Sequence, residues 1–236
     1  MPPDNRTVLV TGASSGIGRA TCARLIDEGY RVIGLARDFS KLGDAITLSA
    51  TLRVDLGKLD ELAPELADLT QAHPQITDVV CCAGRGRFGS LEEFSTSQIR
   101  ALIDLNLTST IMLIRALLPQ LKRNGHGDIV VIGSESAVKG GRMGAVYCAS
   151  KFGLRGFLQS LRYECASANV RTTLINPGMV DTAFFDSLGF APGDAPDQAI
   201  QAADVAETIV GVLATRPGTV IDEINLSPLK HVVRGK

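Results

Sequence analysis

The stretch that most restricts the fold lies near the start of the chain, where a short apolar run meets a glycine-rich turn. The apolar run spans residues 7–10, and residues 11–18 then read Thr-Gly-Ala-Ser-Ser-Gly-Ile-Gly. A helical pattern follows and continues through Glu28. Short apolar runs are typical of strands buried in a parallel sheet. A strand, a glycine-rich turn and a helix in this order are the context in which a dinucleotide phosphate is bound.

Each of the three glycines in this turn is needed for a different physical reason. Gly12 permits the tight turn, Gly16 lets the backbone approach a pyrophosphate, and Gly18 allows the helix to pack closely. The start of the helix then faces the phosphates with free N–H groups and a partial positive charge. Ser14 and Ser15 could add hydroxyl contacts. We therefore predict a dinucleotide site at residues 11–18.

Strands and helices alternate along the rest of the chain. We predict strands over 7–10, 31–35, 51–54, 78–82, 127–132, 171–176 and 219–225, and helices over 59–72, 95–124, 147–168 and 202–215. The helix over 95–124 should bend near Asn106. This alternation predicts an α/β fold in which helices cover both faces of a doubly wound parallel sheet. Residues 1–236 carry no repeat or linker and should form a single domain.

Two segments have the composition of loops, and the end of the chain has no clear pattern. Residues 139–144 contain three glycines and should form a loop. Residues 183–199 are rich in Gly, Pro, Asp and Phe, as expected of a mobile substrate lid. The tail, residues 226–236, is uninformative. Substrate specificity should therefore lie in the loops at 85–94, 135–146 and 183–200.

Charge and cysteine usage exclude several classes of protein. The chain has 24 Lys and Arg against 25 Asp and Glu, so it lacks the basic excess of a nucleic-acid-binding protein. No uninterrupted apolar run reaches about 18 residues, and the first ten residues do not resemble a secretory signal, so we expect no membrane contact. The five cysteines form no Cys-x-x-Cys pair, which favours reduced thiols in a cytoplasmic protein. The three histidines lack the spacing of a metal site.

A cation follows the second predicted strand. Position 36 is Ala and position 37 is Arg, about twenty residues beyond the glycines, where the chain usually meets the adenosine ribose. An acidic residue there would bind the ribose 2′-hydroxyl and repel a 2′-phosphate. A guanidinium suits a phosphate instead, so Arg37 favours NADP(H) over NAD(H). Ser40 is a further candidate contact.

A tyrosine and a lysine four residues apart open the long helix predicted over 147–168. Tyr147 and Lys151 share one helix face, one turn from each other. The pKa of a free tyrosine lies near ~10, and a fixed positive charge favours the phenolate and brings that pKa toward neutral pH. A phenol tuned in this way can serve as a general acid or base. The pair alone is weak evidence, because such a pair also occurs on solvated helix faces.

Together the motifs resemble the short-chain dehydrogenase/reductase family, in its single-domain branch with the TGxxxGxG glycine spacing. The matching residues cover nearly the whole chain: residues 11–18, Asp55, Cys82-Ala83-Gly84, Asn106, Ser134, Tyr147-x-x-x-Lys151 and Asn176-Pro177-Gly178. The resemblance implies a Rossmann fold with seven parallel strands. It also implies a nicotinamide cofactor and the interconversion of a carbonyl and an alcohol by hydride transfer.

The resemblance assigns four catalytic residues. Tyr147 would give a proton to the carbonyl oxygen during reduction and take it back during oxidation. Lys151 would lower the pKa of the tyrosine and hold the nicotinamide ribose. Ser134 would bind the substrate oxygen, with Ser136 as the second choice. Asn106 would support a water that links Lys151 to solvent.

The resemblance also assigns cofactor contacts. Asp55 would accept from the adenine amino group, the Pro177-Gly178 turn would lie behind the nicotinamide, and Thr182 would bind its carboxamide. The full predicted set is Gly12, Ser14, Ser15, Gly16, Ile17, Gly18, Arg37, Asp55, Leu56, Cys82, Ala83, Gly84, Asn106, Tyr147, Lys151, Pro177, Gly178, Val180 and Thr182.

Two departures from the family pattern lead to further expectations. Cys82 stands where the family usually has Asn, and because a thiol is a weak hydrogen-bonding group we expect local repacking rather than loss of activity. The lid is short for the family, which disfavours large substrates. The family further implies a homodimer or homotetramer paired through the helices at 106–124 and 147–168.

Two other readings of the sequence remain. One is a cofactor-sensing regulator that binds NADP but has lost turnover. A sensor has no need for the set Asn106, Ser134, Tyr147 and Lys151, which argues against it. The other is an epimerase or dehydratase of the wider superfamily, which the glycine spacing and the short C-terminal part disfavour.

Overall fold

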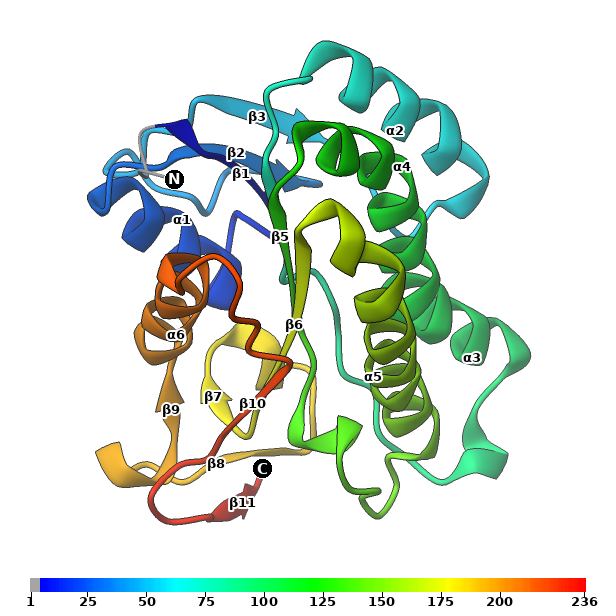
Figure 1. Ribbon diagram of the computed structural model, residues 1–236. Coiled ribbons are helices and arrows are strands. Elements are labelled where there is room, and N and C mark those ends of the chain that lie inside the picture. Colours follow the sequence, from blue (N-terminus) through cyan, green and yellow to red (C-terminus); the bar gives the residue numbers. More distant parts are fainter. Residues whose placement is uncertain (1–4) are drawn as a thin grey trace.

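The computed structural model describes residues 5–236 and is built around a seven-stranded sheet (Figure 1). All its strands are parallel, in the order β10-β6-β5-β4-β1-β2-β3. The strands are β1 (Thr7–Thr11), β2 (Arg31–Ala36), β3 (Ala50–Arg53), β4 (Asp78–Cys81), β5 (Gly127–Ile132), β6 (Val170–Pro177) and β10 (Glu223–Leu226). The predicted doubly wound sheet is confirmed. Its order reverses between β1 and β4, which is where such sheets bind ligands.

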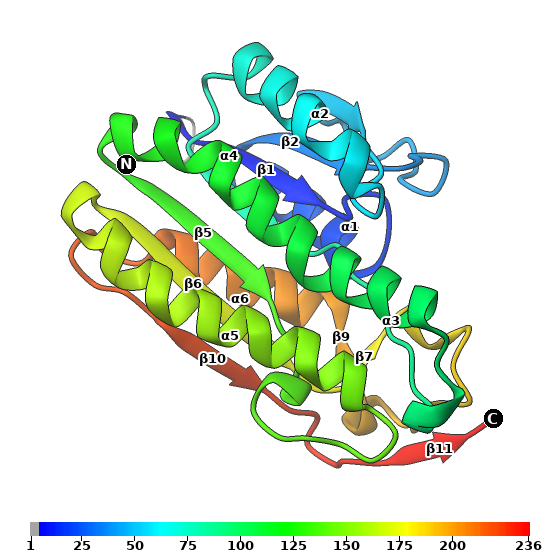
Figure 2. The ribbon, with the colours of Figure 1, turned by 90° about the vertical axis from the view of Figure 1, so that its right-hand side faces the viewer.

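Helices cover both faces of the sheet (Figures 1 and 2). On one face lie α1 (Gly16–Asp27) and α6 (Ala202–Ala214). On the other lie α2 (Leu59–Ala72), α4 (Ser109–Asn124) and α5 (Ala145–Cys165), with α3 (Thr96–Ile103) just before α4. Each helix presents an apolar stripe to the sheet, so the apolar strands are buried on both sides.

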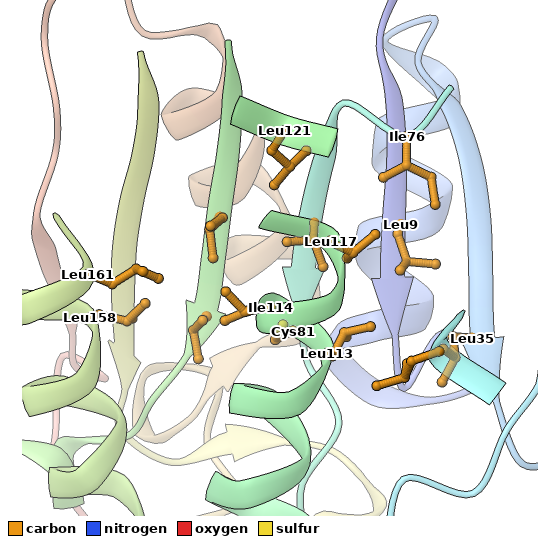
Figure 3. Close-up of a cluster of buried hydrophobic side chains, with 14 of the residues drawn as sticks. Leu9, Leu35, Ile76, Cys81, Leu113, Ile114, Leu117, Leu121, Leu158 and Leu161 are labelled. Atoms are coloured by element: carbon orange, nitrogen blue, oxygen red, sulfur yellow. The ribbon is translucent and has the colours of Figure 1, made fainter. Parts of the chain in front are cut away.

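The larger core lies under α2, α4 and α5. Leu113, Leu117 and Leu121 follow one stripe of α4, while Leu158 and Leu161 come from α5 (Figure 3). All five are buried against strand residues such as Leu9. Full burial of a leucine side chain stabilises the fold by about 1.5–3 kcal/mol, so this stripe fixes α4 on the sheet.

The predicted helix over 95–124 is interrupted near Asn106, where a π-helical turn replaces the regular α-helix. Residues Asp104–Thr108 form this turn between α3 and α4. The whole run Thr96–Asn124 is long and apolar enough to cross a membrane by length and composition alone. Core helices pass the same test, and here Leu102, Leu113 and Leu117 are fully buried in the fold.

The last strand of the sheet begins later than the predicted 219–225 and spans Glu223–Leu226. The backbone of Thr219 is already engaged, because its N–H donates to the carbonyl of Arg216 and its carbonyl accepts from Arg171. The turn itself lies at residues 217–218, and residues 219–222 connect it to the strand without regular structure. The first four residues, on which the prediction of no secretory signal partly rests, lie outside the described part of the chain.

The lid and the tail form two small additional sheets. Strand β7 (Val180–Asp181) pairs in parallel with β9 (Ile200–Gln201). Strand β8 (Phe190–Pro192) lies within the predicted lid and pairs antiparallel with β11 (Val233–Gly235) of the tail. The tail, which is uninformative in the sequence, therefore lies against the lid (Figure 1).

Candidate active site

The predicted site residues gather at the carboxyl ends of the strands. The glycine-rich turn follows β1, residues 82–84 follow β4, Ser134 follows β5, and the Pro177-Gly178 turn ends β6. Because all these strands are parallel neighbours, their carboxyl ends meet at one edge of the sheet.

The glycine-rich turn has the shape that the sequence predicts. Gly12 and Gly16 have positive φ angles of 65° and 50°. A Cβ on Gly18 would lie 2.2 Å from the Gly12 carbonyl oxygen, and a Cβ on Gly12 would lie 3.1 Å from the nitrogen of Ala83. The Ser15 side chain makes no capping bond to α1, so the first N–H groups of the helix are free for a phosphate. This cradle fits a dinucleotide pyrophosphate.

The ends of β2 and β3 carry two exposed arginines. Arg37 follows β2, and Arg53 ends β3 in register with Ala36. Arg53 was not among the predicted cofactor contacts, although its place at the end of the neighbouring strand was a usable signal. Asp38, whose carboxylate would suit a ribose hydroxyl, was not predicted either. The Asp38 carboxylate accepts from the backbone and hydroxyl of Ser40, and these bonds lower its pKa.

The predicted adenine-side residues follow β3 and β4. Asp55 accepts a 3.0 Å bond from the Gly57 nitrogen, and Leu56 is buried. The nitrogen of Ala83 donates to Thr11 Oγ1 at 3.1 Å, which ties residues 82–84 to β1. Burial raises the pKa of the Cys82 thiol to about 12. A hydrogen bond with the Thr21 side chain lowers this pKa by a smaller amount. Cys82 is therefore a neutral thiol that packs against the core under α1 and α6.

Asn106 is completely buried in the π-helical turn. Its amide group donates to the Arg85 carbonyl at 2.9 Å and to Ser150 Oγ at 3.2 Å, and its oxygen accepts from the Arg85 nitrogen at 3.0 Å. A Cβ on Gly84 would lie 3.3 Å from Asn106 Oδ1 and 3.8 Å from Lys151 Nζ. The structure therefore brings Asn106, Gly84 and Lys151 together.

Lys151 is buried beside the end of β5. Its Nζ donates to the Ile132 carbonyl at 3.0 Å and lies 5.9 Å from the centre of the Tyr147 ring. Burial lowers the pKa of this ammonium to about 8. A group with this pKa changes charge near physiological pH, which is unusual for a lysine.

Tyr147 departs from the expected ionisation. Burial raises the pKa of its phenol to about 12, while a hydrogen bond with Ser134 lowers it and Cys148 and Glu135 raise it slightly. The predicted lowering by Lys151 is therefore not the dominant effect in this structure. The physical reason is that the ammonium bonds to the Ile132 carbonyl instead of the phenol. The phenol is accordingly held in its proton-carrying form.

Ser134 is fixed from two sides. Its nitrogen donates to Asn176 Oδ1 at 3.3 Å, and its hydroxyl accepts from the Ser136 nitrogen at 3.1 Å. The Asn176 amide donates in turn to Glu223 and Asn225 at the end of the sheet. Sequence analysis treated Asn176 only as part of a motif and missed this bracing. Ser136, the second-choice serine, orients Ser134.

The start of the lid reaches back to the glycine-rich turn. Val180 is buried in β7 and pairs with Ile200. Thr182 Oγ1 accepts from the Phe184 nitrogen at 3.3 Å, and its methyl group lies 3.5 Å from the position of a Cβ on Gly16. The predicted contacts Gly16 and Thr182 therefore face each other across the site.

Aromatic rings that the sequence analysis missed surround the phenol. The Phe88 ring lies 5.0 Å from that of Tyr147, and the Phe184 ring lies at 6.2 Å. Phe190 packs edge-on against Phe88 at 5.0 Å, and Phe185 completes the group. We call Phe88, Phe184, Phe185 and Phe190 the aromatic wall. Phenylalanines scattered through loops form no sequence pattern, so only the fold reveals this wall.

Comparisons with known proteins show which family the chain is similar to. The family model for short chain dehydrogenases matches residues 6–190. Mouse 17-beta-hydroxysteroid dehydrogenase type 1 is 34% identical over 207 residues, which cover 83% of this chain and 60% of the relative. Human retinol dehydrogenase 8 is 35% identical over 190 residues, which cover 76% of this chain and 60% of the relative. The chain therefore spans about 60% of the length of these relatives.

A solved structure extends the similarity to the whole fold. The alcohol dehydrogenase from the archaeon Thermococcus sibiricus, complexed with 5-hydroxy-NADP, superposes with a TM-score of 0.84. It is 25% identical, and the match covers 96% of this chain and 98% of that one.

Proposed function

The chain belongs to the short-chain dehydrogenase family, and on this basis we propose that it interconverts a carbonyl and an alcohol with NADP(H) as the hydride carrier. The observation that carries the proposal is the convergence of four side chains at one edge of the sheet. Tyr147, Ser134, Lys151 and Asn106 lie together there, next to a glycine cradle that fits a dinucleotide.

The roles follow from what each side chain is able to do. Tyr147 carries a proton at its phenol oxygen and, during reduction, passes it to the carbonyl oxygen. The Ser134 hydroxyl binds the same oxygen and stabilises the charge that develops on it. Lys151 would hold the ribose of a bound cofactor next to the nicotinamide. The nicotinamide of the bound cofactor would supply the hydride.

Resupply of the proton is the proposed role of Asn106. Its side chain is fully engaged with Arg85 and Ser150, so it fixes the π-helical turn instead of reacting. A π-helical turn interrupts the regular i→i+4 ladder and leaves backbone groups available. We propose that a water held by this turn connects Lys151 to solvent.

We propose NADP(H) rather than NAD(H), on the arrangement of charges at the ribose end. Arg37 and Arg53 are exposed on neighbouring strand ends, and Asp38 is engaged by Ser40. Two guanidinium groups attract a 2′-phosphate, which each can bind through paired N–H donors. The NADP derivative bound by the archaeal structure is consistent with this preference.

The proposed substrate is an apolar ketone or secondary alcohol. The aromatic wall lies against Tyr147 and offers it the apolar surface of four phenylalanine rings. The two curated relatives are named for a steroid and for retinol, both lipophilic alcohols. An apolar ring or chain next to the carbonyl would pack on this wall.

An assay at the nicotinamide absorbance band tests the proposal. Purified protein with NADPH and a panel of apolar ketones should consume the cofactor, and the panel should be repeated with NADH. Binding of NADPH without turnover of any carbonyl or alcohol would instead support the sensor reading. No observation in the described residues favours that reading.

We also propose that the protein is a homodimer or homotetramer in the cytoplasm. Phe152 and Tyr163 on α5 are exposed large side chains, as expected of a helix that packs against a second subunit. Light scattering that reports a monomer would contradict this.

A further inference from the structure

The C-terminal residues 228–236, here called the tail segment, follow the lid along its length. Strand β11 of the tail segment pairs with β8 of the lid, with Arg234 opposite Ala191. Backbone bonds continue on both sides of this pair, from the Gly193 nitrogen to the Val232 carbonyl at 3.2 Å and from the Lys236 nitrogen to the Gly189 carbonyl at 3.0 Å. Strand β8 of the lid and strand β11 of the tail segment therefore form a two-stranded antiparallel ribbon.

Side chains of the tail segment add to this pairing. Lys236 Nζ donates to the Phe185 carbonyl at 2.6 Å, so it contacts the backbone of the aromatic wall directly. Arg234 pairs with Asp194 at 3.0 Å, and Lys230 pairs with Asp197 at 2.7 Å. The two ion pairs are solvent-exposed and contribute little. The backbone pairing and the Lys236 bond therefore hold the lid more than the ion pairs do.

A second contact of the tail segment lies beside Ser134, the proposed catalytic serine. His231 Nε2 is 3.6 Å from Glu135 Oε2, and Glu135 immediately follows Ser134. Pro228 lies against the Pro177-Gly178 turn, since a Cβ on Gly178 would be 3.3 Å from its Cδ. The tail segment thus spans the distance between the lid and the turns that follow β5 and β6.

The aromatic wall connects the lid, which the tail segment holds, to Tyr147. Phe190 of β8 packs edge-on against Phe88, and Phe88 lies 5.0 Å from Tyr147. Phe184 packs against the opposite loop so closely that a Cβ on Gly86 would lie 2.5 Å from its ring. A shift of β8 therefore moves the rings that border the phenol.

We propose that the tail segment determines substrate size: by pairing with β8 it holds the aromatic wall against Tyr147 and limits the space for the group attached to the reacting carbonyl. This inference rests on the proposed function and adds to it a segment outside the loops at 85–94, 135–146 and 183–200. The tail segment acts through the lid, so its residues are positioning residues.

The two substitutions Arg234→Pro and Arg234→Ala test the proposal at one position. Proline removes the N–H that the strand pairing needs, while alanine keeps the backbone and removes only the exposed ion pair with Asp194. Hydrogen exchange of the amides in 186–193 should become about tenfold faster in Arg234→Pro and stay near wild type in Arg234→Ala. Unchanged exchange in Arg234→Pro would overturn the proposal.

Turnover supplies the second readout. The ratio of kcat/KM for 2-decalone to that for cyclohexanone should rise by about tenfold in Arg234→Pro, because the bulkier ketone gains most from a displaced wall. The affinity for NADPH should not change. Faster lid exchange with an unchanged ratio would also overturn the proposal, since the tail segment would then hold the lid without selecting substrate.

A second variant tests the same proposal if the Arg234→Pro protein does not fold. Lys236→Met keeps the apolar stem and removes the bond to the Phe185 carbonyl, so it should shift the exchange and the ratio in the same direction by a smaller amount. If wild-type protein with NADPH reduces no carbonyl at all, the proposed function fails. The exchange measurements still decide in that case whether the tail segment holds the lid.

Discussion

The side-chain oxygen of Asn176 lies 3.3 Å from the backbone nitrogen of Ser134, and only a glycine at position 133 leaves room for this contact. A Cβ on Gly133 would stand 2.2 Å from Asn176 Oδ1. The asparagine is itself held by Glu223 and Asn225, so it cannot move away without breaking those bonds. The position of Ser134 therefore depends on a missing side chain one residue before it.

Gly133→Ala should lower kcat by about 10²-fold or more while leaving NADPH affinity nearly unchanged, because Ser134 would lose its place beside Tyr147. Steady-state kinetics and a fluorescence titration with NADPH measure the two effects. Gly211→Ala in α6 is the matched control, since a Cβ at Gly211 meets nothing within 4 Å and the residue lies outside the loops predicted to select substrate. Equal rates in the two variants would show that Ser134 does not need the Asn176 brace.

Tyr147→Phe should reduce turnover by about 10²–10⁴-fold, because the phenol proton is lost while the ring still packs against Phe88. NADPH binding should stay close to wild type. Tyr163→Phe, an exposed tyrosine on the same helix, serves as the control. A Tyr147→Phe enzyme with normal rates would remove this residue from the mechanism.

The sheet and the helices that cover it could be predicted from the sequence, because strands and helices carry regular apolar patterns. The fifth strand and the helix over 59–72 were predicted to their first and last residues, and the bend predicted near Asn106 falls at the π-helical turn between α3 and α4. The last strand was predicted to begin too early. The bond from Arg171 to the Thr219 carbonyl holds the residues before this strand out of the sheet, and a pattern of apolar residues does not reveal it.

The aromatic wall and the role of the tail segment could not be predicted from the sequence. Phe88, Phe184 and Phe190 come from three segments without periodicity, and their rings meet only after the sheet brings the lid over Tyr147. The pKa of that tyrosine was also out of reach, since it depends on complete burial. Motifs indicate candidate reacting side chains, whereas the arrangement of loops and the burial of side chains depend on the whole fold.

Arg37→Asp should raise the KM for NADPH far more than the KM for NADH, because a carboxylate repels the 2′-phosphate and suits the 2′-hydroxyl. A change of about tenfold or more in the ratio is expected for loss of one charged hydrogen-bonding group. Arg31→Asp is the control, since Arg31 is exposed at the opposite end of the same strand. An equal effect of Arg37→Asp on both cofactors would mean that Arg37 does not read the phosphate.

Lys151 should make cofactor affinity depend on pH near 8. Its pKa in the folded protein is about 8, below the usual 10.5, so the ammonium that we propose holds the ribose is mostly present below pH 8 and mostly lost above it. NADPH should therefore bind more weakly as pH rises from 7 to 10. Between 8 and 10.5 the unfolded chain binds this proton and the folded chain does not, so the same group adds stability as pH rises. An affinity that stays constant over this range would show that the charge of Lys151 is not needed.

Stability should depend most on a buried ionic cluster at the end of the sheet opposite the site. Arg6 donates to Asp78 at 2.9 Å, to Asp128 at 2.6 Å and to the Leu213 carbonyl at 2.7 Å, and both carboxylates are almost fully buried. Asp78→Ala removes one carboxylate and leaves the buried guanidinium undercompensated, which should cost about 3–5 kcal/mol in the free energy of unfolding.

Urea denaturation measures this cost, with Glu61→Ala as the control. Glu61 pairs with Lys58 in solvent, so its loss should change the free energy of unfolding by less than about 1 kcal/mol. Because the cluster lies at the opposite ends of the strands from Ser134, folded Asp78→Ala protein should keep near-normal kcat at low temperature. A large fall in kcat without loss of stability would mean that the two ends of the sheet are coupled.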